Sequence, residues 1–420
     1  MSGYELTTLP SGLRVASEFL PGVESVAVTL TVGTGARYES LEENGISHLL
    51  EHMAFKGTTT RSARDIAEAF DAIGGQINAY TSMEMTVYYA KVLKEHAPLA
   101  VEILADIMLN SVFSEEELKR EQEVIIQEIA MHFDTPDDLI VDYFDETAFP
   151  NQPLGRSILS TSERVAGYTR DDLFTYMGKH YHPSNMVISA AGNISHQGFV
   201  QLVGEHFTQT ATLPASRAEQ ALYGGGDIRM ERDLEQLHLI MGLPAVSLHS
   251  PQYYALNLYA NILGGGMSSR LFQEVREKRG LAYTVYAMGS AYEDVGLMSI
   301  YAATAPEKSG ELSTVLCEQV AAMASTVTDA ELSRAKNQQK AELLMAREAP
   351  QTVAGWMGRH LLLFGEYRTA ADISKRVDAV TLADIEKLGT QIAAGKLTLA
   401  ALGDVSGVAA YDELQQKLAA

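Results

Sequence analysis

The chain repeats part of its own sequence about 211 residues further along, and this repeat restricts the possible fold more than any other feature. Four patterns of the first half recur in the same order in the second: Arg164-Val165 with Thr169 and Asp172 as Arg376-Val377 with Thr381 and Asp384, 191–195 as 402–406, Glu117-Leu118 as Glu331-Leu332, and a helix–glycine–strand unit at Gly75 as one at Gly280. Shared helical periodicity explains one such match, but not four in one order. The sequence therefore predicts two tandem homologous domains of one α+β fold.

The length and a change of composition place the boundary between these domains. The chain has 420 residues, more than the ~250–300 at which a single core usually divides. Between 209 and 226 it turns to Thr, Ala, Pro and Ser and ends in Gly224-Gly225-Gly226, which is typical of a linker. We expect an N-terminal domain over 1–208, a linker over 209–226 and a C-terminal domain over 227–420. Each should be a mainly antiparallel sheet packed with helices.

Hydrophobic periodicity predicts the elements of the first domain. The expected strands are a hairpin over 5–20 that turns at Pro10-Ser11-Gly12, followed by 25–32, 76–82, 85–93 and 185–191. The expected helices cover about 44–57, 62–73, 95–111, 115–133, 136–147 and 169–180.

The helix near 44–57 carries the clearest chemical motif, His48-Leu49-Leu50-Glu51-His52. Residues four apart lie on one helical face, so both imidazoles can reach one tetrahedral zinc ion. Glu51 is then close enough to take a proton from the attacking water, as in H-x-x-E-H peptidases. The alternative is a chance arrangement on a solvent-exposed helix. The corresponding helix of the second half, about 251–264, has no histidine pair, so the sequence predicts one catalytic and one non-catalytic domain.

A zinc site needs a third protein ligand, and the helix over 115–133 offers candidates. Glu121 and Glu128 are two turns apart on a partly apolar face, where a carboxylate is costly unless it is paired or bound to a metal. Their positions alone leave open which of them is the ligand, or whether both reach solvent. His132 on the same helix is a weaker candidate for the third ligand than Glu128, because a carboxylate completes many open catalytic zinc sites. His180 and His182 are two apart but have no third ligand nearby.

The charge of the chain bears on its ligands, and its cysteine content bears on its location. The net charge is −22, which makes nucleic acid an improbable ligand and favours basic peptides, although it equally serves solubility. Cys317 is the single cysteine, so no intrachain disulfide forms, as suits a reducing cytoplasm. With no signal sequence and no apolar run of ~18 residues, we expect a cytoplasmic protein without a membrane partner.

The motif and its surroundings resemble the pitrilysin family of inverzincin zinc metallopeptidases from end to end. The similarity rests on 48–58, on Gly74-Gly75 with Asn78, Ala79 and Thr81, on Glu121 and Glu128, and on 153–156 and 181–186. Within that family, the sequence most resembles the β-subunit of the mitochondrial processing peptidase and its bacterial relatives. The resemblance implies a processing-peptidase-like metallohydrolase fold and one Zn²⁺ per chain.

The resemblance also assigns roles to individual residues. It makes Glu128 the third zinc ligand with His48 and His52, and Glu121 a supporting catalytic glutamate beside Glu51. Arg276 and Tyr283 match the family's substrate-binding pair, and Asn78 and Ala79 lie on a strand whose edge pairs with the peptide.

The implied function is an endopeptidase or oligopeptidase for unstructured, basic peptides, enclosed in a chamber formed by a homodimer. A heterodimer with a sibling chain is the alternative assembly. The alternative function is a non-catalytic structural or substrate-presenting subunit, and a zinc hydrolase for non-peptide substrates is a third. The sequence leaves open the cleavage preference, the role of 264–266 and the opening of the chamber.

Overall fold

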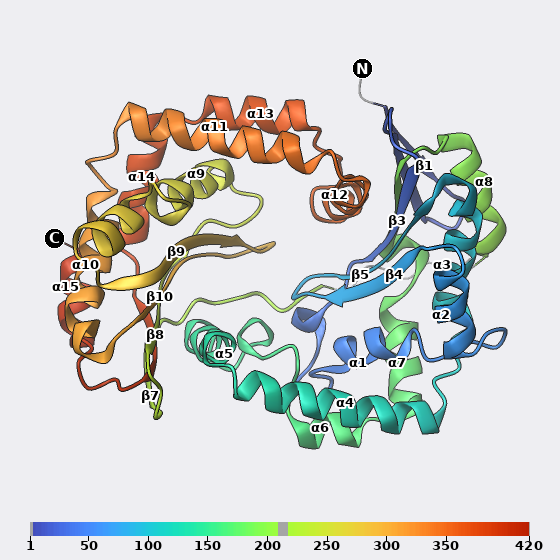
Figure 1. The fold of residues 1–420 in the computed structure, drawn as a ribbon, viewed down its shortest axis with the longest axis horizontal. Coiled ribbons are helices and arrows are strands. Elements are labelled where there is room, and N and C mark those ends of the chain that lie inside the picture. The colour runs from blue at the N-terminus through green and yellow to red at the C-terminus, as the bar shows by residue number, and fades with distance from the viewer. Residues whose placement is uncertain (1–2, 209–216, 420) are drawn as a thin grey trace. The chain divides into compact units, whose positions relative to one another are not determined.

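A computed structural model of the chain describes residues 3–208 and 217–419. By its contacts the chain forms two compact units (Figure 1). Unit 1 combines Met1–Ala130, Ser157–Glu219 and Leu344–Thr369, and unit 2 combines Met131–Arg156, Gln220–Leu343 and Ala370–Ala420. The predicted boundaries at 208 and 227 follow the sequence repeat, whereas these units exchange two segments. The predicted linker 209–226 lies partly outside the described residues.

Unit 1 is built on a six-stranded sheet with the spatial order β1-β2-β6-β3-β5-β4. Its strands are β1 (Tyr4–Thr8), β2 (Arg14–Phe19), β3 (Ser25–Val32), β4 (Gln76–Thr81), β5 (Thr86–Leu93) and β6 (Met186–Gly192). The pair β2–β6 is parallel and the other pairs are antiparallel. The predicted hairpin and strands are confirmed, and β4 forms one edge of the sheet.

Helices cover one face of this sheet and enclose the main core of unit 1. They are α1 (Ile46–Met53), α2 (Ala63–Asp71), α3 (Ala97–Leu109), the first part of α4 (Glu115–Phe133), α6 (Ser162–Gly167), α7 (Arg170–His180) and α8 (His196–His206). Alternation along β3 explains the packing, because Val26, Val28 and Leu30 face this core. Ala27 faces the opposite side. Helix α1 ends at Met53, one turn before the predicted Gly57.

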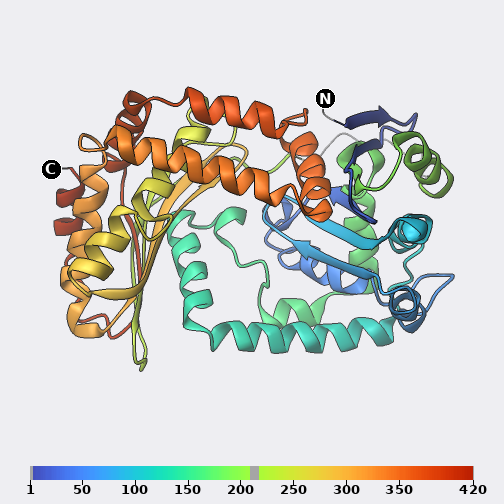
Figure 2. The same cartoon turned by 45° about the horizontal axis from the view of Figure 1, so that its top comes forward.

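A helix from the second half of the sequence covers the other face of the unit 1 sheet. Helix α12 (Pro350–Leu363), orange-red in Figure 2, lies against this face. Its residues Val353, Met357 and Leu361 pack against small strand residues such as Ala27. The approach is close, because a Cβ added to Gly358 would lie 2.2 Å from Oγ1 of Thr31. A glycine is therefore required where the helix crosses β3.

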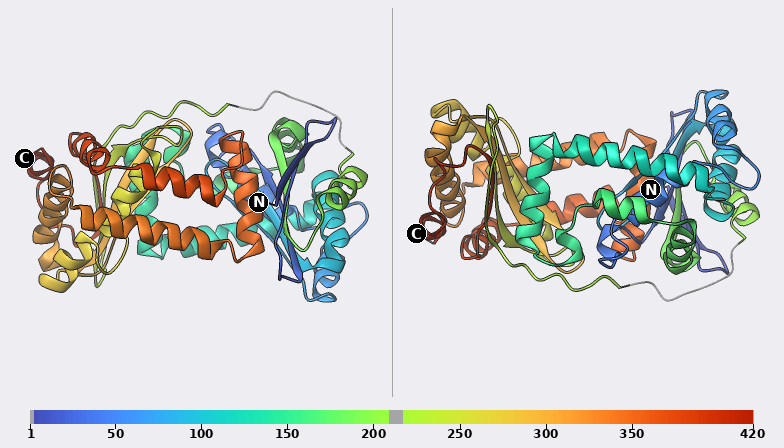
Figure 3. Two further views of the ribbon diagram at one scale, coloured as in Figure 1. Left: turned by 90° about the horizontal axis from the view of Figure 1, so that it is seen from above. Right: turned by 90° about the horizontal axis from the view of Figure 1, so that it is seen from below.

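Unit 2 repeats this plan with five strands in the order β7-β11-β8-β10-β9. The strands are β7 (Gly226–Glu231), β8 (Leu237–Ala245), β9 (Ala282–Ala291), β10 (Gly296–Thr304) and β11 (Thr398–Gly403). The helices are α5 (Pro136–Ala148), α9 (Tyr253–Gly264), α10 (Ser309–Ala322), most of α11 (Asp329–Ala346), α13 (Ala370–Ala379), α14 (Leu382–Ala393) and α15 (Tyr411–Leu418). Helices α9, α10 and α14 pack on one face of this sheet, and α5 lies on the other (Figure 3).

The two units confirm the duplication that the sequence predicts. In both, one central strand pairs in parallel with an outer one, β6 with β2 and β11 with β7. Gly192 and Gly403 end β6 and β11 with φ of 125° and 129°. The repeated Thr–Asp pairs form capping boxes, Thr169 with Asp172 on α7 and Thr381 with Asp384 on α14. The predicted α+β fold with tandem homologous domains is therefore confirmed.

Helix α5 is the counterpart of α12, because it comes from the first half of the sequence and packs on the unit 2 sheet. Here the glycine is on the strand, and a Cβ on Gly242 of β8 would lie 2.3 Å from Cζ of Phe144.

Among the helices of residues 3–208 and 217–419, none has both the length and the apolar character of a membrane span.

Candidate active site

Helix α1 carries the histidine motif, and a buried carboxylate anchors its first turn. Glu39, with 1% of its surface exposed, accepts hydrogen bonds from the backbone N–H groups of Gly45 and Ser47, both at 2.8 Å. Gly45 has a φ of 91°, which favours glycine. Burial raises the pKa of Glu39, although the hydrogen bonds from Ser47 and Gly45 oppose this shift. These contacts fix the start of the helix and hence the positions of its histidines.

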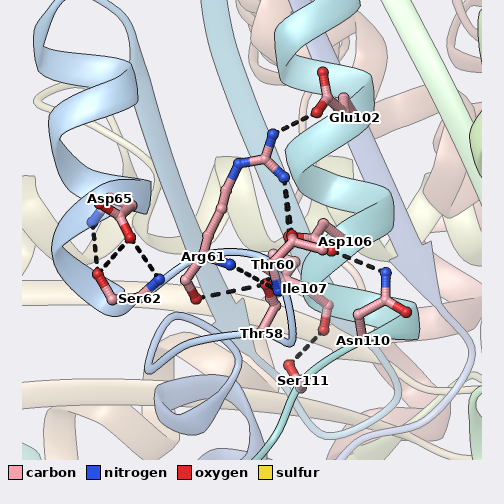
Figure 4. A network of polar contacts seen from close by, with 10 residues as sticks. All are labelled: Thr58, Thr60, Arg61, Ser62, Asp65, Glu102, Asp106, Ile107, Asn110 and Ser111. Atoms are coloured by element: carbon pink, nitrogen blue, oxygen red, sulfur yellow. Dashed lines mark hydrogen bonds and ion pairs between the residues drawn. The ribbon is translucent and has the colours of Figure 1, made fainter.

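The segment that follows α1 is tied to α3 through Asp106 (Figure 4). The hydroxyls of Thr58 and Thr60 each donate to Oδ2 of Asp106 at 2.7 Å, and Arg61 donates to the same oxygen at 3.0 Å. Burial alone would raise the pKa of Asp106, but the hydrogen bonds from Thr58, Thr60, Asn110 and Arg61 together hold the pKa below its usual range. The motif helix is thus held at both ends.

The structure brings His48 and His52 of α1 together with Glu128 of α4. One potential ligand atom from each lies within 4.8 Å of the others. Oε2 of Glu128 is 3.8 Å from Nε2 of His48 and 3.6 Å from Nε2 of His52. Within residues 3–208 and 217–419, this is the one group of three or more His, Cys, Asp or Glu side chains with such a geometry.

This trio fits the requirements of a zinc ion. Ligands bound at about 2.1 Å in a tetrahedron lie about 3.4 Å apart, close to the distances in this cluster. Two imidazoles and one carboxylate are the protein ligands of many catalytic zinc sites, which keep a fourth position open. Burial and the neighbouring His52 lower the pKa of His48 to about 4, so its imidazole is neutral at pH 7, as metal binding requires.

Glu121 lies on the Nδ1 side of His52, whereas Glu128 lies on the Nε2 side. Nδ1 of His52 is 3.1 Å from Oε2 of Glu121, and the other carboxylate oxygen of Glu121 is 2.6 Å from Nζ of Lys56. An N–H on Nδ1 that donates to Glu121 leaves Nε2 of His52 free for a metal. The two glutamates of α4 therefore differ in their contacts. Glu128 faces both histidines, whereas Glu121 contacts and orients His52 alone.

Glu51 lies on the same helix and is held by the edge strand β4. Its Oε2 accepts a hydrogen bond of 2.6 Å from the hydroxyl of Thr81. Burial raises the pKa of Glu51, and the hydrogen bond from Thr81 acts in the opposite direction. A carboxylate in this position can accept a proton from a water molecule near the histidines.

Asn78 and Ala79 lie in the middle of β4, whose outer edge has no neighbouring strand among the described residues. The backbone N–H of Ala79 donates to Oδ1 of Asn78 at 2.8 Å. An edge of this kind offers backbone groups to an added peptide strand. Their role in binding substrate remains a prediction.

Arg276 and Tyr283 form a contact within unit 2. The Arg276 guanidinium lies over the Tyr283 ring, 4.3 Å from its centroid, and over Phe272 at 4.7 Å. Tyr283 is 75% exposed. A cation stacked on an exposed aromatic ring leaves both groups able to contact a ligand, and their role in substrate binding also remains a prediction.

The lower-ranked histidines have other partners. Nε2 of His132 is 2.8 Å from Oδ2 of Asp142. His180 packs against the ring of Tyr176, and Nδ1 of His182 is 2.9 Å from Oγ of Ser184. None of the three belongs to the metal-capable group found among the described residues.

Sequence reasoning assigned no role to three residues that position the site, namely Glu39, Lys56 and Thr81. Strand alternation places Thr81 on the same face of β4 as Ala79, and Lys56 follows His52 by one helical turn. Those spacings could have suggested both residues. Glu39 had no such signal, because its contact depends on the turn at Gly45.

Two family models match most of the chain. Residues 14–162 match the model described as "Insulinase (Peptidase family M16)", and residues 167–339 match "Peptidase M16 inactive domain". An uncharacterized zinc protease of Rickettsia felis is 42% identical over 403 residues, covering 95% of this chain and 97% of the relative. One of Bacillus subtilis is 42% identical over 387 residues, covering 92% of this chain and 94% of the relative.

Solved structures share the fold over nearly the whole chain. A protease from Helicobacter pylori superposes with a TM-score of 0.90 at 22% identity, over 96% of this chain and 100% of that one. A chain of complex III2 from Candida albicans superposes with a TM-score of 0.87 at 20% identity, over 99% of both.

The matches confirm the peptidase family that the motif predicts, and the inactive-domain model, over 167–339, covers a part of the chain without the histidine pair. Relatives at 42% identity that cover more than nine tenths of the chain carry the name of zinc protease. The chain therefore belongs to peptidase family M16, the insulinase family, and its cofactor is zinc.

Proposed function

We propose that this protein is a zinc endopeptidase or oligopeptidase that hydrolyses flexible peptides. The observation that carries the proposal is the convergence of His48, His52 and Glu128, with their ligand atoms within 4.8 Å of one another. Glu51 lies beside them on α1 and is not needed as a ligand. These residues would hold one zinc ion per chain.

When bound, zinc polarises the peptide carbonyl and makes a water molecule more acidic. The chain's own residues do the rest. Glu51 takes the proton from the attacking water and passes it to the leaving amine. Thr81 holds Glu51 in place through the 2.6 Å hydrogen bond. Glu121 keeps His52 in the tautomer and orientation that suit a ligand.

The substrate in this proposal is an extended peptide that pairs with the free edge of β4. Asn78 and Ala79 supply backbone groups there, and strand addition needs a flexible rather than a folded substrate. Arg276 and Tyr283 are included as substrate-binding residues because of the family resemblance. The net charge of −22 supports basic peptides as the preferred class.

The proposed assembly is a homodimer that encloses the peptide in a closed chamber, with a heterodimer as the alternative. It rests on the family resemblance and on the presence of one histidine-bearing half per chain. The cytoplasmic location remains a prediction.

A non-catalytic subunit is the competing function, and the similarity of fold to a chain of complex III2 from Candida albicans is the observation in its favour. A likeness at 20% identity concerns the fold alone. The complete set of His48, Glu51, His52 and Glu128 supports the peptidase instead, because a structural subunit has no need of it.

Hydrolysis of an internally quenched basic peptide tests the proposal. The purified chain should cleave it, and Glu51→Gln should reduce kcat by at least about a thousandfold while zinc content stays at one ion per chain. Glu123→Gln is the control, because Glu123 is an exposed glutamate of α4. A zinc-loaded wild-type protein that cleaves no unstructured peptide would support the non-catalytic alternative.

A further inference from the structure

Unit 1 contains a cavity on the sheet face opposite α1. It has a volume of about 480 Å³ and lies between α12 and strands β3, β4 and β5. None of the residues that line it belongs to the histidine cluster. Its size is enough for one or two amino-acid residues.

Aromatic side chains form much of the cavity wall. Tyr80 of β4 and Tyr89 of β5 have ring centroids 6.4 Å apart, and Trp356 of α12 also lines the cavity. Tyr80 is 48% exposed although it lies in a strand of the sheet. Such surfaces pack well against the aliphatic or planar part of a ligand.

Of the side chains that the structure describes, two cationic ones and no acidic one line the cavity, in a protein whose net charge is −22. Lys91 and Arg359 both line it. Across residues 3–208 and 217–419, neither of these two side chains takes part in an ion pair with a carboxylate. Two cations without acidic partners at one cavity favour an anionic ligand.

Two further groups at the cavity favour an anion or an acceptor. Residues 349–352, the first turn of α12, line it, and the N–H groups at a helix N-terminus lack partners within the helix and attract negative charge. Thr29 is only 1% exposed, and its buried hydroxyl has no hydrogen-bond partner among the described residues. An unpaired buried hydroxyl is costly unless something in the cavity bonds to it.

The position of the cavity relates it to the edge of β4. Successive side chains of a strand point to opposite faces, so Tyr80 faces the cavity while Ala79 and Thr81 face the side of α1. A peptide added along β4 would likewise direct every second side chain towards the face with the cavity.

We propose that this cavity binds a carboxylate of the peptide substrate, held by Arg359 and Lys91 while the adjoining carbon atoms pack among Tyr80, Tyr89 and Trp356. The inference rests on the proposed peptidase function. The carboxylate comes either from an acidic side chain or from the peptide C-terminus, which even a basic peptide carries. The cavity would thus add a requirement for one negative group to a general preference for basic peptides.

The chain provides its own probe, because Trp356 is its one tryptophan. Tryptophan fluorescence of the full-length Glu51→Gln protein is titrated with short acetylated and amidated peptides that contain one glutamate, or glutamine in its place. A third peptide carries the glutamine and a free C-terminal carboxylate. We expect a saturable change, with a Kd about tenfold lower for at least one carboxylate peptide than for the neutral one. Which of the two binds identifies the source of the carboxylate.

Arg359→Gln should remove this difference, and added NaCl should reduce it. Arg64→Gln is the matched control, because Arg64 is also an exposed helical arginine of unit 1, 86% exposed and paired with Glu68. Equal binding of neutral and acidic peptides, no fluorescence change with any peptide, or an unchanged preference in Arg359→Gln would overturn the proposal. Failure of the peptidase function shows separately, as absence of hydrolysis by the wild-type chain.

Discussion

Nδ1 of His52 lies 3.1 Å from Oε2 of Glu121, a carboxylate that also contacts Nζ of Lys56 at 2.6 Å. The imidazole is therefore held from behind, with Nε2 directed to Glu128. Two glutamates seven residues apart on α4 thus contact different atoms. Glu128 faces Nε2 of both histidines, and Glu121 faces Nδ1 of His52.

Glu121→Gln should weaken zinc binding without abolishing it. Partners that orient a metal-binding histidine typically contribute about 10–100-fold to metal affinity, so an increase of that size in the zinc Kd is expected. Competition with a chromogenic chelator measures it. Glu123→Gln should leave the Kd unchanged, and an equal loss in both variants would contradict a specific role for Glu121.

Thr81→Val should lower kcat about tenfold while zinc content remains that of the wild type, because the valine cannot donate the hydrogen bond that holds Glu51. Thr81→Ser keeps a hydroxyl and should restore most of the rate. Steady-state hydrolysis of a quenched peptide, with metal analysis of each variant, distinguishes this role from a general loss of structure. If Thr81→Ser were as slow as Thr81→Val, the hydroxyl would not be the group that matters.

Gly358→Ala should destabilise unit 1, since the added Cβ would lie 2.2 Å from Oγ1 of Thr31 and force α12 away from β3. We expect a decrease of about 1–3 kcal/mol in the free energy of unfolding, measured in urea. Gly355→Ala is the control on the same helix, where a Cβ meets nothing within 4 Å. That change should be neutral or stabilising by up to about 1 kcal/mol. Similar effects of both changes would argue against the close packing of α12.

Asp145 in unit 2 makes stability depend on pH. Burial, and secondarily the charge of Asp142, raise the pKa of Asp145 to about 7 in the folded chain. A raised pKa means that the folded state holds the proton more tightly, so this stabilisation is complete below the unfolded value near 4 and is lost as pH rises through about 7. We expect a loss of about 2 kcal/mol between pH 5 and 8.5.

Asp145→Asn should remove that dependence and make the protein more stable than the wild type at pH 8.5. Urea unfolding at pH 5 and pH 8.5 measures the free energy of unfolding of both proteins. The difference between variant and wild type isolates Asp145, because buried histidines such as His180 contribute equally to both. Glu146→Gln, an exposed neighbour, should follow the wild type. An Asp145→Asn protein with an unaltered pH dependence would show that Asp145 does not titrate in this range.

The sequence was sufficient for elements with strong local signals. Alternation in 25–32 predicted β3 to the residue, and the helix predicted over about 169–180 is α7, with Thr169 as its N-cap. The motif predicted two histidines on one face. Spacing alone left Glu121 and Glu128 open, and only the family resemblance separated them, because periodicity gives the face of α4 but not the distance of each carboxylate from α1.

The exchange of α5 and α12 could not be predicted from the sequence. An amphipathic pattern shows that a helix has an apolar face, but not which sheet covers it. The glycines that allow close packing, Gly358 and Gly242, have no distinguishing local pattern either. The support of Glu51 by Thr81 depends on the pairing of β4 with β5 and on the position of α1, which are long-range features.

The account depends most on where the zinc ion binds, and anomalous diffraction from zinc-loaded crystals at the zinc absorption edge tests this directly. We predict one strong anomalous peak per chain, about 2.0–2.2 Å from Nε2 of His48, Nε2 of His52 and a carboxylate oxygen of Glu128. A peak elsewhere, or one bound by the two histidines with the Glu128 carboxylate turned away, would contradict the account.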